Sequence, residues 1–598
     1  MMSIDFKKSL LAVLVATALT ACGGGGGGGG DDPEPKPEPK PTPVDPVTDV
    51  TAVSDLAGKY DSKINSYACY NGTNDYCKLI IYQVMVEAAP NGGEADGKGI
   101  GWGPSNHVGT LRGIKNSLDF IKGVNANALW ITPVFYTSDD GEDKDKDKKT
   151  YASGYYATQH LSGTSAFIDS AFGGLSSFNE LVQATHDKEM SFILDGVFGH
   201  AKSDFSGAAV KSNKCTKMGG GTENASSFMT CFDWDSEETL DYYKNLATKM
   251  ITEYDIDGWR FDQAYQVPNQ KWKVITKAIK DAATSGRLGA GYSVAEVWSG
   301  TTGNIEDSVF KDAAVGSAFN FPLRYKLVQV IAGQENKSDG WATLQSASSL
   351  AGAYGYASVT DYSDHTVMPN MFVDNHDLVR FGNLLFRYNI VNESNVAGER
   401  YSLRHLMAFA FQMAYSGPIT IYYGSEYGDY TRGFSSQISD CGTGEKWCDD
   451  HVSRTQMVSG ESGLKDWQKT LRSNVASMMK YRLEHPALYN GERYHIYSTT
   501  ENPADRDAEN FYVDVKTTAD KSDAFVFVMS TSEIERKLNF NEDVSKYVCQ
   551  KAKNTDTCSL ELVIDTSKPT VTAVDAETLE GSFSFNMKPE SVKLYKVN

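Results

Sequence analysis

Strand-like and helix-like segments alternate along this chain from about residue 78 to residue 485. Eight apolar runs of strand length, most of them hydrophobic on both faces, are separated by segments whose apolar residues recur at helical spacing. The runs cover residues 78–87, 128–135, 190–200, 256–262, 292–298, 318–323, 368–377 and 418–428. Strands buried on both faces and joined by helices are typical of parallel sheets. The pattern therefore predicts an α/β fold, a parallel (β/α)8 TIM barrel.

The length of 598 residues leaves room for more than the barrel. Residues 201–234, after the third run, form a longer segment than a usual strand-to-helix loop and are expected to fold as an inserted subdomain over the barrel mouth. Near the end, short alternating runs such as "AFVFVMS" predict a C-terminal antiparallel β-sandwich. We expect a signal peptide at 1–21, a tether at 22–55, the barrel at 56–487 and the sandwich at 488–598.

The N-terminus is typical of an export signal. Lys7 and Lys8 precede an apolar run that is too short for a lasting membrane anchor, followed by "LTAC" ending at Cys22. "LTAC" resembles a bacterial lipobox, which implies cleavage before Cys22 and lipid on its thiol; the alternative is an ordinary secretory signal. The glycine-rich and proline-rich segment that follows would hold a folded body away from a membrane. Because Gly23 follows Cys22, resemblance to Gram-negative sorting implies the outer membrane, on its periplasmic or cell-surface side.

The other eight cysteines fall into neighbouring pairs. The pairs are Cys69 with Cys77, Cys215 with Cys231, Cys441 with Cys448, and Cys549 with Cys558. No C-x-x-C spacing supports zinc, so we predict four local disulfides formed in an oxidising compartment.

The net charge of −20 argues against binding of nucleic acid or anionic lipid, because phosphate neutralisation requires clustered lysine and arginine. A neutral or cationic substrate fits this balance better, and we expect the chain to be a monomer.

Charged and polar side chains stand where several of the apolar runs end. They are Asp195, His200, Arg260, Asp262, Glu296, His376 and Asp377. The carboxyl ends of barrel strands form the active-site face, so these side chains are expected to meet at one mouth. Each has a purely structural alternative when taken singly: a buried ion pair for Arg260 with Asp262, or a hydrogen-bonded core histidine.

Four ordered motifs resemble those of the α-amylase family of retaining α-glucan hydrolases and transglycosidases. They are "DGVFGH" at 195–200, "GWRFD" at 258–262, "AEVW" at 295–298 and "FVDNHD" at 372–377. "GYY", "FGGLSSFNELV", "IYYGSE" and "HPALYNG" are supporting matches, and the resemblance spans about residues 78–490.

The resemblance implies a role for each of these residues. Retaining glycoside hydrolysis requires two carboxyl groups about 5 to 5.5 Å apart, a nucleophile and an acid/base. By motif match Asp262 is the nucleophile, Glu296 the acid/base, and Asp377 the carboxylate that grips hydroxyls of the sugar in subsite −1. Arg260, on the same strand face, would keep Asp262 ionised, whereas Glu296 needs a more apolar setting to start protonated, to which Trp298 would contribute.

The same resemblance implies a set of substrate-binding residues. His200 and His376 would hydrogen-bond the sugar ring in subsite −1, and Tyr155 would stack under it. Asp195 is expected to support the strand end through hydrogen bonds. A tyrosine such as Tyr155 would, taken alone, more often be a packing residue.

Departures from the family pattern concern calcium. Gly199 stands where many members have a calcium-binding asparagine, and Tyr265 and Gln266 stand where a Lys-His pair is frequent. Glycine offers no side-chain oxygen, so the usual ion site is degraded, although a structural Ca²⁺ elsewhere, for example near Asn91 and Asp96, stays an alternative. The Cys215–Cys231 bridge is a hypothetical replacement for the ion. No cofactor is expected for the chemistry.

Taken together, these observations favour an α-amylase that hydrolyses α-1,4-glucosidic bonds in starch and maltodextrins with retention. Alternatives are a cyclomaltodextrinase or neopullulanase-like enzyme and an α-1,6-acting or transglycosylating relative; "FDWDSEE" at 232–238 favours the α-1,4 reading. A non-catalytic glucan-binding protein is disfavoured, because Asp262 and Glu296 are both present.

Overall fold

The structure is a computed structural model that describes most of the chain after residue 74. The described residues are 49–53, 69, 75–138, 154–163, 165–311, 314–333, 344–352, 367–434, 448–499, 510–573 and 577–598. The expected signal peptide and Cys22 lie outside them, so export and lipid attachment stay predictions. Within the described part, no helix has both the length and the apolar character needed to cross a membrane.

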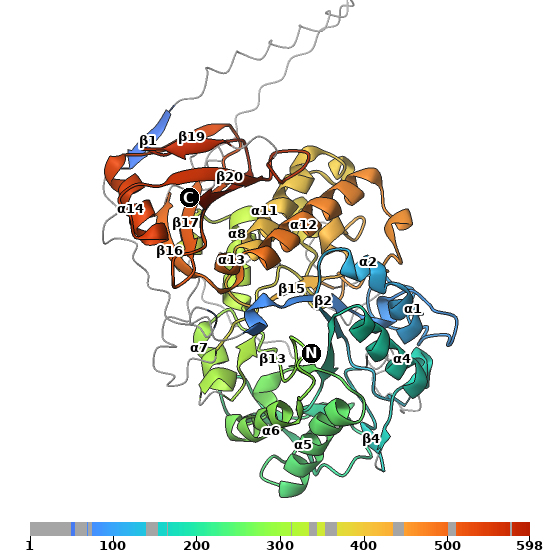
Figure 1. The fold of residues 1–598 in the computed structure, drawn as a ribbon. Coiled ribbons are helices and arrows are strands. Elements are labelled where there is room, and N and C mark those ends of the chain that lie inside the picture. Colours follow the sequence, from blue (N-terminus) through green and yellow to red (C-terminus); the bar gives the residue numbers. More distant parts are fainter. Residues whose placement is uncertain are drawn as a thin grey trace, which may run out of the picture. The chain divides into compact units, whose positions relative to one another are not determined.

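The core of the fold is a curled parallel sheet (Figure 1). Its strand order is β14-β13-β12-β6-β3-β2-β15, and all neighbours run parallel. The strands are β2 (Ile80–Val84), β3 (Ala128–Ile131), β6 (Ser191–Gly196), β12 (Gly258–Phe261), β13 (Ser293–Ala295), β14 (Ser317–Ala318) and β15 (Ile419–Tyr422). Six of them lie within the predicted apolar runs, whereas β14 begins one residue before the run 318–323, and residues 321–323 of that run begin helix α8 instead of continuing the strand.

The eighth strand position is held by a short segment that closes the ring. Asn370 forms a parallel bridge with Phe319, just after β14, and Met371 forms one with Ile419 of β15. The backbone N–H of Thr420 also donates to the carbonyl of Met371 at 2.8 Å. The predicted (β/α)8 barrel is therefore confirmed.

Alternate residues of the strands pack into different cores, which explains why the runs are apolar throughout. On β2 and β3, Tyr82 and Leu129 belong to the large core shared with the helices. Their neighbours Ile81 and Trp130 belong to a separate core. A parallel strand buried on both faces needs apolar side chains at every position.

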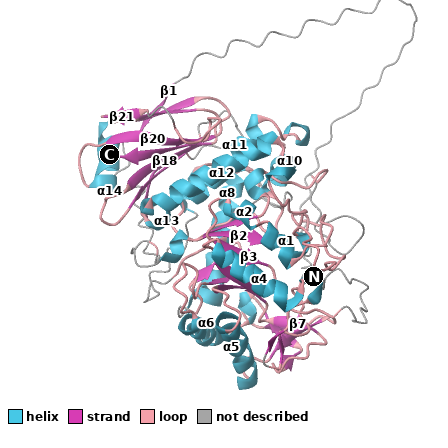
Figure 2. Cartoon of the chain, turned by 45° about the vertical axis from the view of Figure 1, so that its right-hand side comes forward, coloured by secondary structure: helices cyan, strands magenta, loops and turns pink. Residues whose placement is uncertain are grey.

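Helices cover the outside of the sheet (Figures 1 and 2). They include α1 (Leu111–Asn116), α2 (Leu118–Lys122), α4 (Gly174–Asp187), α5 (Glu237–Thr252), α6 (Asn269–Ala282), α8 (Phe321–Ile331), α10 (Phe381–Arg387), α11 (Glu399–Met413) and α12 (Asp466–Glu484). On α4, Phe178, Leu181 and Val182 are buried, which is the helical spacing seen in the sequence.

The inserted segment after β6 consists of short strands. They are β7 (His200–Lys202), β8 (Lys211–Ser212), β9 (Lys214–Thr216), β10 (Thr222–Asn224) and β11 (Met229–Phe232). β7, β11 and β8 form one sheet, β9 and β10 form a hairpin, and the Cys215–Cys231 disulfide joins β9 to β11. Because β7 begins at His200, this subdomain starts at a predicted site residue.

The C-terminal region is a β domain with its own core. Its larger sheet is antiparallel, in the order β16 (Glu492–Ser498), β17 (Phe511–Thr517), β18 (Ala524–Ser530), β23 (Ser591–Val597), β20 (Ser559–Asp565) and β21 (Thr578–Glu580). A second sheet contains β19 (Arg536–Phe540), β22 (Ser584–Met587) and β1 (Asp49–Val53), with β1 parallel to β19. Residues 49–53 fall within the predicted tether at 22–55 but form a strand of this domain.

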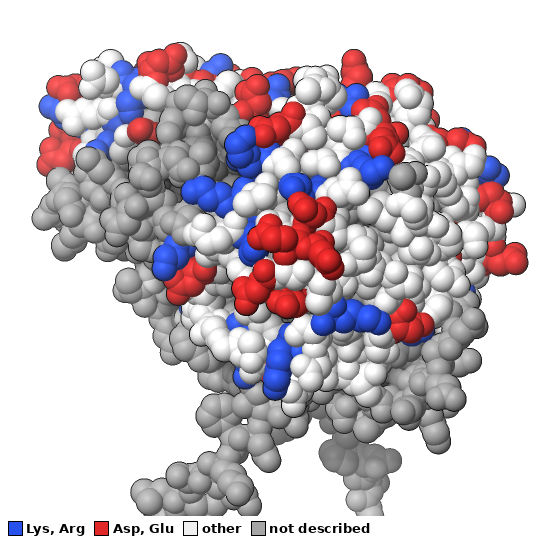
Figure 3. Space-filling view, turned by 90° about the horizontal axis from the view of Figure 1, so that it is seen from below, with Lys and Arg blue, Asp and Glu red and all other residues white. Residues whose placement is uncertain are grey.

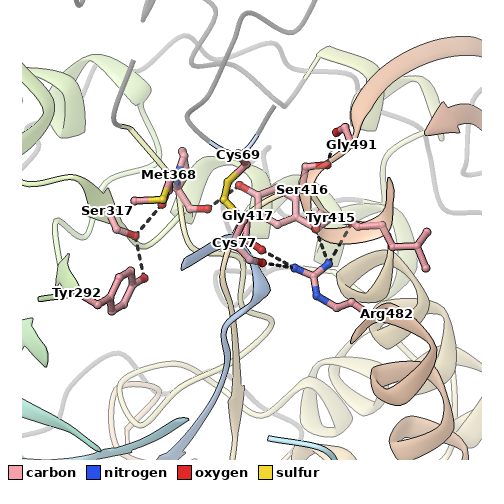
Figure 4. Close-up of a disulfide and its surroundings, with 12 residues drawn as sticks. Cys69, Cys77, Tyr292, Ser317, Met368, Tyr415, Ser416, Gly417, Arg482 and Gly491 are labelled. Carbon is pink, nitrogen blue, oxygen red and sulfur yellow. Dashed lines mark hydrogen bonds between the residues drawn. A yellow bond between two sulfur atoms is a disulfide. The ribbon is translucent and has the colours of Figure 1, made fainter. Parts of the chain in front are cut away.

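Three of the four predicted disulfides are formed in the described residues: Cys69–Cys77, Cys215–Cys231 and Cys549–Cys558. Cys448 is also disulfide-bonded, and its expected partner Cys441 lies outside the described residues. The Cys69–Cys77 bridge lies beside the buried guanidinium of Arg482, which donates to the carbonyl of Cys77 at 3.0 Å (Figure 4).

The face of the molecule shown in Figure 3 carries both signs of charge, with acidic side chains gathered near its centre. No broad basic area is visible on this face, in keeping with the net charge of −20.

Candidate active site

The carboxyl ends of β6, β12 and β13 bring one arginine and three carboxyl groups together. Arg260 is fully buried; its Nη1 donates to Asp195 Oδ1 at 2.9 Å and to Asp262 Oδ1 at 2.8 Å, and its Nη2 lies 3.9 Å from Glu296 Oε2. The strand register causes this meeting, because Arg260 pairs with Asp195, and Phe261 pairs with Ala295. Asp262 and Glu296 are thus the residues that directly follow two adjacent strands, β12 and β13.

The two groups assigned to catalysis differ in their environments. Burial raises the pKa of Glu296 to about 8; the positive charge of Arg260 opposes this shift, and the negative charges of Asp262 and Asp377 add to it. Asp262 instead has the guanidinium of Arg260 in direct hydrogen-bond contact. At neutral pH the site therefore holds a protonated Glu296 next to a carboxylate that is paired with a cation.

Asp195 has the position of a supporting residue. It is fully buried, and its oxygens accept hydrogen bonds from Arg260, from Tyr155 Oη at 2.9 Å and from Trp130 Nε1 at 3.3 Å. Burial raises the pKa of Asp195 to about 7, although Arg260 opposes this. With these contacts made to protein groups, Asp195 is suited to hold Arg260 in place.

A hydrogen-bonded chain connects this cluster to His376. Gln83 Nε2 donates to His376 Nδ1 at 2.7 Å, so the ring proton is on Nε2, which lies 2.6 Å from Tyr155 Oη. Burial lowers the pKa of His376 to about 3, so the ring is neutral at ordinary pH. The Tyr155 ring stacks on the His376 ring, with centroids 5.4 Å apart and planes at 14°.

Asp377 is held by His376 and by a residue that the sequence analysis missed. Arg454 Nη2 donates to Asp377 Oδ1 at 2.8 Å, and His376 Nε2 lies 3.2 Å from Asp377 Oδ2. Burial opposes ionisation of Asp377, but the pKa of Asp377 is lowered overall by its contacts with the His376 ring and with the positively charged guanidinium of Arg454. Arg454 comes from an irregular segment without periodicity, so no sequence signal marked it. Gln83, a polar residue inside the apolar run "KLIIYQVMVE", could have been noticed.

His200 completes the group. It is almost fully buried, with Nε2 4.0 Å from Asp262 Oδ2 and Nδ1 2.8 Å from Gln266 Oε1. The structure therefore gathers all seven predicted site residues at the carboxyl ends of the barrel strands. It adds Arg454, Gln83, Trp130 and Gln266 as their direct partners.

The residues near Gly199 do not fit the calcium ion that is usual between barrel and subdomain. A Cβ atom on Gly199 would lie 2.3 Å from Gln266 Oε1 and 2.5 Å from Gln266 Cβ, so the Gln266 side chain fills this space. In the part of the chain that the structure describes, no group of three or more His, Cys, Asp or Glu side chains could hold a metal ion.

Because the Gln266 side chain fills the place of the usual ion, we expect removal of divalent ions to leave the protein unchanged. Dialysis against EDTA should alter neither the unfolding temperature nor activity, because chelators act on folds in which a metal is part of the structure. Replacing Cys215 and Cys231 together by serine should instead destabilise the subdomain, by about 3 kcal/mol in the chain-entropy estimate. Scanning calorimetry with and without EDTA checks both; loss of activity in EDTA that added calcium restores would contradict the first expectation.

The comparisons with known proteins identify the family. A family model described as the α-amylase catalytic domain matches residues 91–218 and 223–500. The chain belongs to the α-amylase family. Among solved structures, AmyP in complex with maltose has 30% identity and a TM-score of 0.70, covering 88% of this chain and 97% of that one.

Two curated members of the α-amylase family match over shorter spans. A cyclomaltodextrinase of Thermoanaerobacter pseudethanolicus is 26% identical over 383 residues, which are 58% of this chain and 57% of that protein. An intracellular maltogenic amylase of Bacillus subtilis is 25% identical over 375 residues, 58% of this chain and 55% of that protein. The chain thus spans just over half the length of these curated relatives.

Proposed function

We propose that this member of the α-amylase family is a retaining glycoside hydrolase that cleaves α-1,4-glucosidic bonds in starch and maltodextrins. The observation that carries the proposal is the arrangement around Arg260, which contacts Asp262 at 2.8 Å while the buried Glu296 beside it has a pKa raised to about 8. One carboxylate and one carboxylic acid side by side are what double displacement needs. Likeness to AmyP, whose structure contains maltose, supports an α-glucan as substrate.

In the first step, Glu296 gives its proton to the glycosidic oxygen while an oxygen of Asp262 attacks the anomeric carbon. The bond to the leaving sugar breaks, and a covalent ester to Asp262 forms. The negative charge of Asp262 disappears in this ester. Because that charge is one cause of the raised pKa of Glu296, the pKa of Glu296 then falls.

In the second step, the deprotonated Glu296 takes a proton from water. The resulting hydroxide equivalent attacks the anomeric carbon, the ester breaks, and Asp262 leaves as a carboxylate. Return of its charge raises the pKa of Glu296 again and resets the site. Asp377, whose pKa is lowered and whose carboxylate accepts a hydrogen bond from Arg454, binds sugar hydroxyls as positive charge develops on the ring.

A second candidate is an enzyme that prefers cyclic maltodextrins. Two relatives are named cyclomaltodextrinase and maltogenic amylase, and Tyr265 and Gln266 replace the family's frequent Lys-His pair next to the site. The family resemblance implies that these two positions influence the subsites that bind the leaving sugar, so their replacement is expected to affect which glycosidic bond is cleaved.

One experiment separates the two candidates. The purified full-length chain is incubated separately with amylose, pullulan and β-cyclodextrin; products are resolved by chromatography, and their fresh anomeric form is followed by proton NMR. Short α-maltooligosaccharides formed fastest from amylose support the proposal. Faster turnover of β-cyclodextrin or pullulan favours the second candidate, β-anomeric products contradict retention, and no turnover of any substrate rejects both.

The raised pKa of Glu296 predicts the alkaline limit of activity. Protonated Glu296 is the active form for the first step, so kcat/KM is expected to be fully retained below its pKa and to fall about tenfold per pH unit above about pH 8. Maltotetraose, whose leaving sugar needs protonation, gives this profile when it is assayed from pH 5 to 10. Glu296→Gln, which has no proton to lose, should show low activity without this limb; the same limb in the variant would assign it to another group.

A further inference from the structure

The turn that follows Asp262 contains a glutamine whose side chain contacts site residues on another strand. Gln266 ends the short helix η4 (Ala264–Gln266) and is only 5% exposed. Its Oε1 lies 2.8 Å from His200 Nδ1, and its Nε2 donates to Gln263 Oε1 at 3.1 Å. The proposed mechanism has not used Gln266.

The hydrogen bonds of this turn fix the direction of each amide. Tyr265 Oη donates to Gln263 Oε1 at 2.8 Å, so that oxygen accepts two hydrogen bonds, one from Tyr265 and one from Gln266 Nε2. The Oε1 of Gln266 is then an acceptor that faces His200 Nδ1, and Nδ1 must carry the ring proton. In the neutral ring, Nε2 is therefore an acceptor, and it lies 4.0 Å from Asp262 Oδ2.

The same turn also touches the acid/base. The backbone N–H of Gln263 donates to Glu296 Oε2 at 2.8 Å, from a residue with φ of +39°. A non-glycine residue in this left-handed region persists only where its surroundings hold it. The side-chain bonds of Gln263 to Tyr265 and Gln266 are such restraints.

Gly199 leaves the space that Gln266 needs. A Cβ atom there would lie 2.3 Å from Gln266 Oε1, whereas Gly199 does not have a left-handed backbone. Alanine at position 199 would therefore be tolerated by the backbone, and the three atoms nearest to its Cβ would all belong to the Gln266 side chain. Gly199 and Gln266, two separate departures from the family pattern in the sequence, are one packed pair in the structure.

We infer that Gln266 is a positioning residue for the proposed glycosidase reaction: packed against Gly199, it sets the tautomer and orientation of His200 beside Asp262, so that His200 Nε2 accepts a hydrogen bond from a sugar hydroxyl. This inference rests on the proposed function. In this chain the side chain of Gln266 would order the junction between barrel and subdomain. A bound ion does not fit there.

The test begins with Gln266→Met, which keeps the length of the side chain and removes its polar atoms. Loss of the acceptor leaves the His200 ring free to turn. Because small misplacements of a site residue reduce the rate, kcat/KM on maltotetraose is expected to fall roughly 10- to 100-fold. The matched control is Gln412→Met. Gln412 is also buried and donates to the backbone carbonyls of Met371 and Thr420, so its loss should lower the unfolding temperature without lowering kcat/KM at 25 °C.

A size exchange at the packed pair separates positioning from packing. Gly199→Ala alone should lower both the unfolding temperature and kcat/KM, because its Cβ displaces Gln266. Gly199→Ala with Gln266→Gly removes the clash, including the contact of 2.5 Å with the Cβ of Gln266, so the unfolding temperature should recover toward the wild-type value while kcat/KM stays low. Recovery of both quantities would show a packing role only and would overturn the inference.

The outcomes also separate this inference from the proposed function. If the wild-type chain is active on amylose and Gln266→Met keeps the wild-type kcat/KM, the inference alone is overturned. A wild-type chain that turns over no α-glucan overturns both. An active wild type with the variant losses described above supports both.

Discussion

Sodium azide is expected to rescue Asp262→Ala and Glu296→Ala with opposite stereochemistry. Asp262 and Glu296 share the guanidinium of Arg260, at 2.8 and 3.9 Å, but are assigned different roles. Without azide, Glu296→Ala should hydrolyse amylose about 10²- to 10⁴-fold more slowly, the usual contribution of general acid–base catalysis. Asp262→Ala should hydrolyse amylose at least as slowly as Glu296→Ala, because no covalent intermediate can form.

The substrate for the rescue is an aryl α-maltotrioside, whose leaving group needs no protonation. In Glu296→Ala, Asp262 still forms its ester, and azide then attacks that ester to give an α-maltotriosyl azide. In Asp262→Ala, azide occupies the space of the missing carboxylate and displaces the aryl group directly, which gives the β-azide. Proton NMR of the products distinguishes the two anomers.

A matched control is Asp195→Asn, which changes the third carboxyl group on Arg260. Asp195 contacts Arg260, Tyr155 and Trp130, so its loss should slow turnover without opening a path for azide. No glycosyl azide of either form is expected from this variant. The same azide anomer from Asp262→Ala and Glu296→Ala, or the reverse assignment, would contradict the roles proposed here.

The barrel could be predicted because burial on both strand faces leaves a direct trace in the sequence. Neighbours such as Ile81 and Tyr82 face different cores, so both must be apolar, and the resulting run is visible without a structure. The run at 368–377 was predicted too long, since only Asn370 and Met371 form bridges. Pro369 precedes them and has no N–H to donate, which limits the ladder.

The site was predictable where its residues follow strands and not where loops supply them. Asp262 and Glu296 end apolar runs, and parallel strands bring such positions together. Arg454 reaches Asp377 from a segment 77 residues later along the chain, and neither spacing nor periodicity records that contact. The fit of Gln266 to Gly199 was likewise hidden, because complementary shape is a property of the folded side chains.

Replacement of Arg482 is expected to give a large loss of stability with little loss of catalysis. Arg482 of α12 is fully buried and donates only to backbone carbonyls among the described residues (Figure 4). Nη1 reaches Met413 at 3.0 Å and Tyr415 at 2.5 Å, at and beyond the end of α11, where helix carbonyls lack intrahelical partners. Nη2 reaches Cys77 at 3.0 Å and Gly417 at 2.5 Å.

Cys77 and Gly417 precede β2 and β15, so Arg482 joins the amino ends of two adjacent strands, away from the catalytic mouth. Arg482→Met would leave several buried carbonyls without donors, each costing about 1–3 kcal/mol before relaxation. We expect a net decrease of roughly 4 kcal/mol in the free energy of unfolding. Arg482→Lys should lie between, because an ammonium has three donors for these carbonyls.

Urea unfolding and kcat at 25 °C measure the two effects separately. The matched control is Lys480→Met, two residues away on α12, where the side chain is 67% exposed and 3.8 Å from Glu484. An exposed pair of this kind contributes about 0–1 kcal/mol, so the control should unfold near the wild-type midpoint. If Arg482→Met unfolds there as well, the carbonyls must find other donors, and the stability of this end of the barrel does not depend on the guanidinium. If kcat falls as far as stability does, the amino ends of the strands are coupled to the mouth, contrary to the separation of stability and chemistry expected for this barrel.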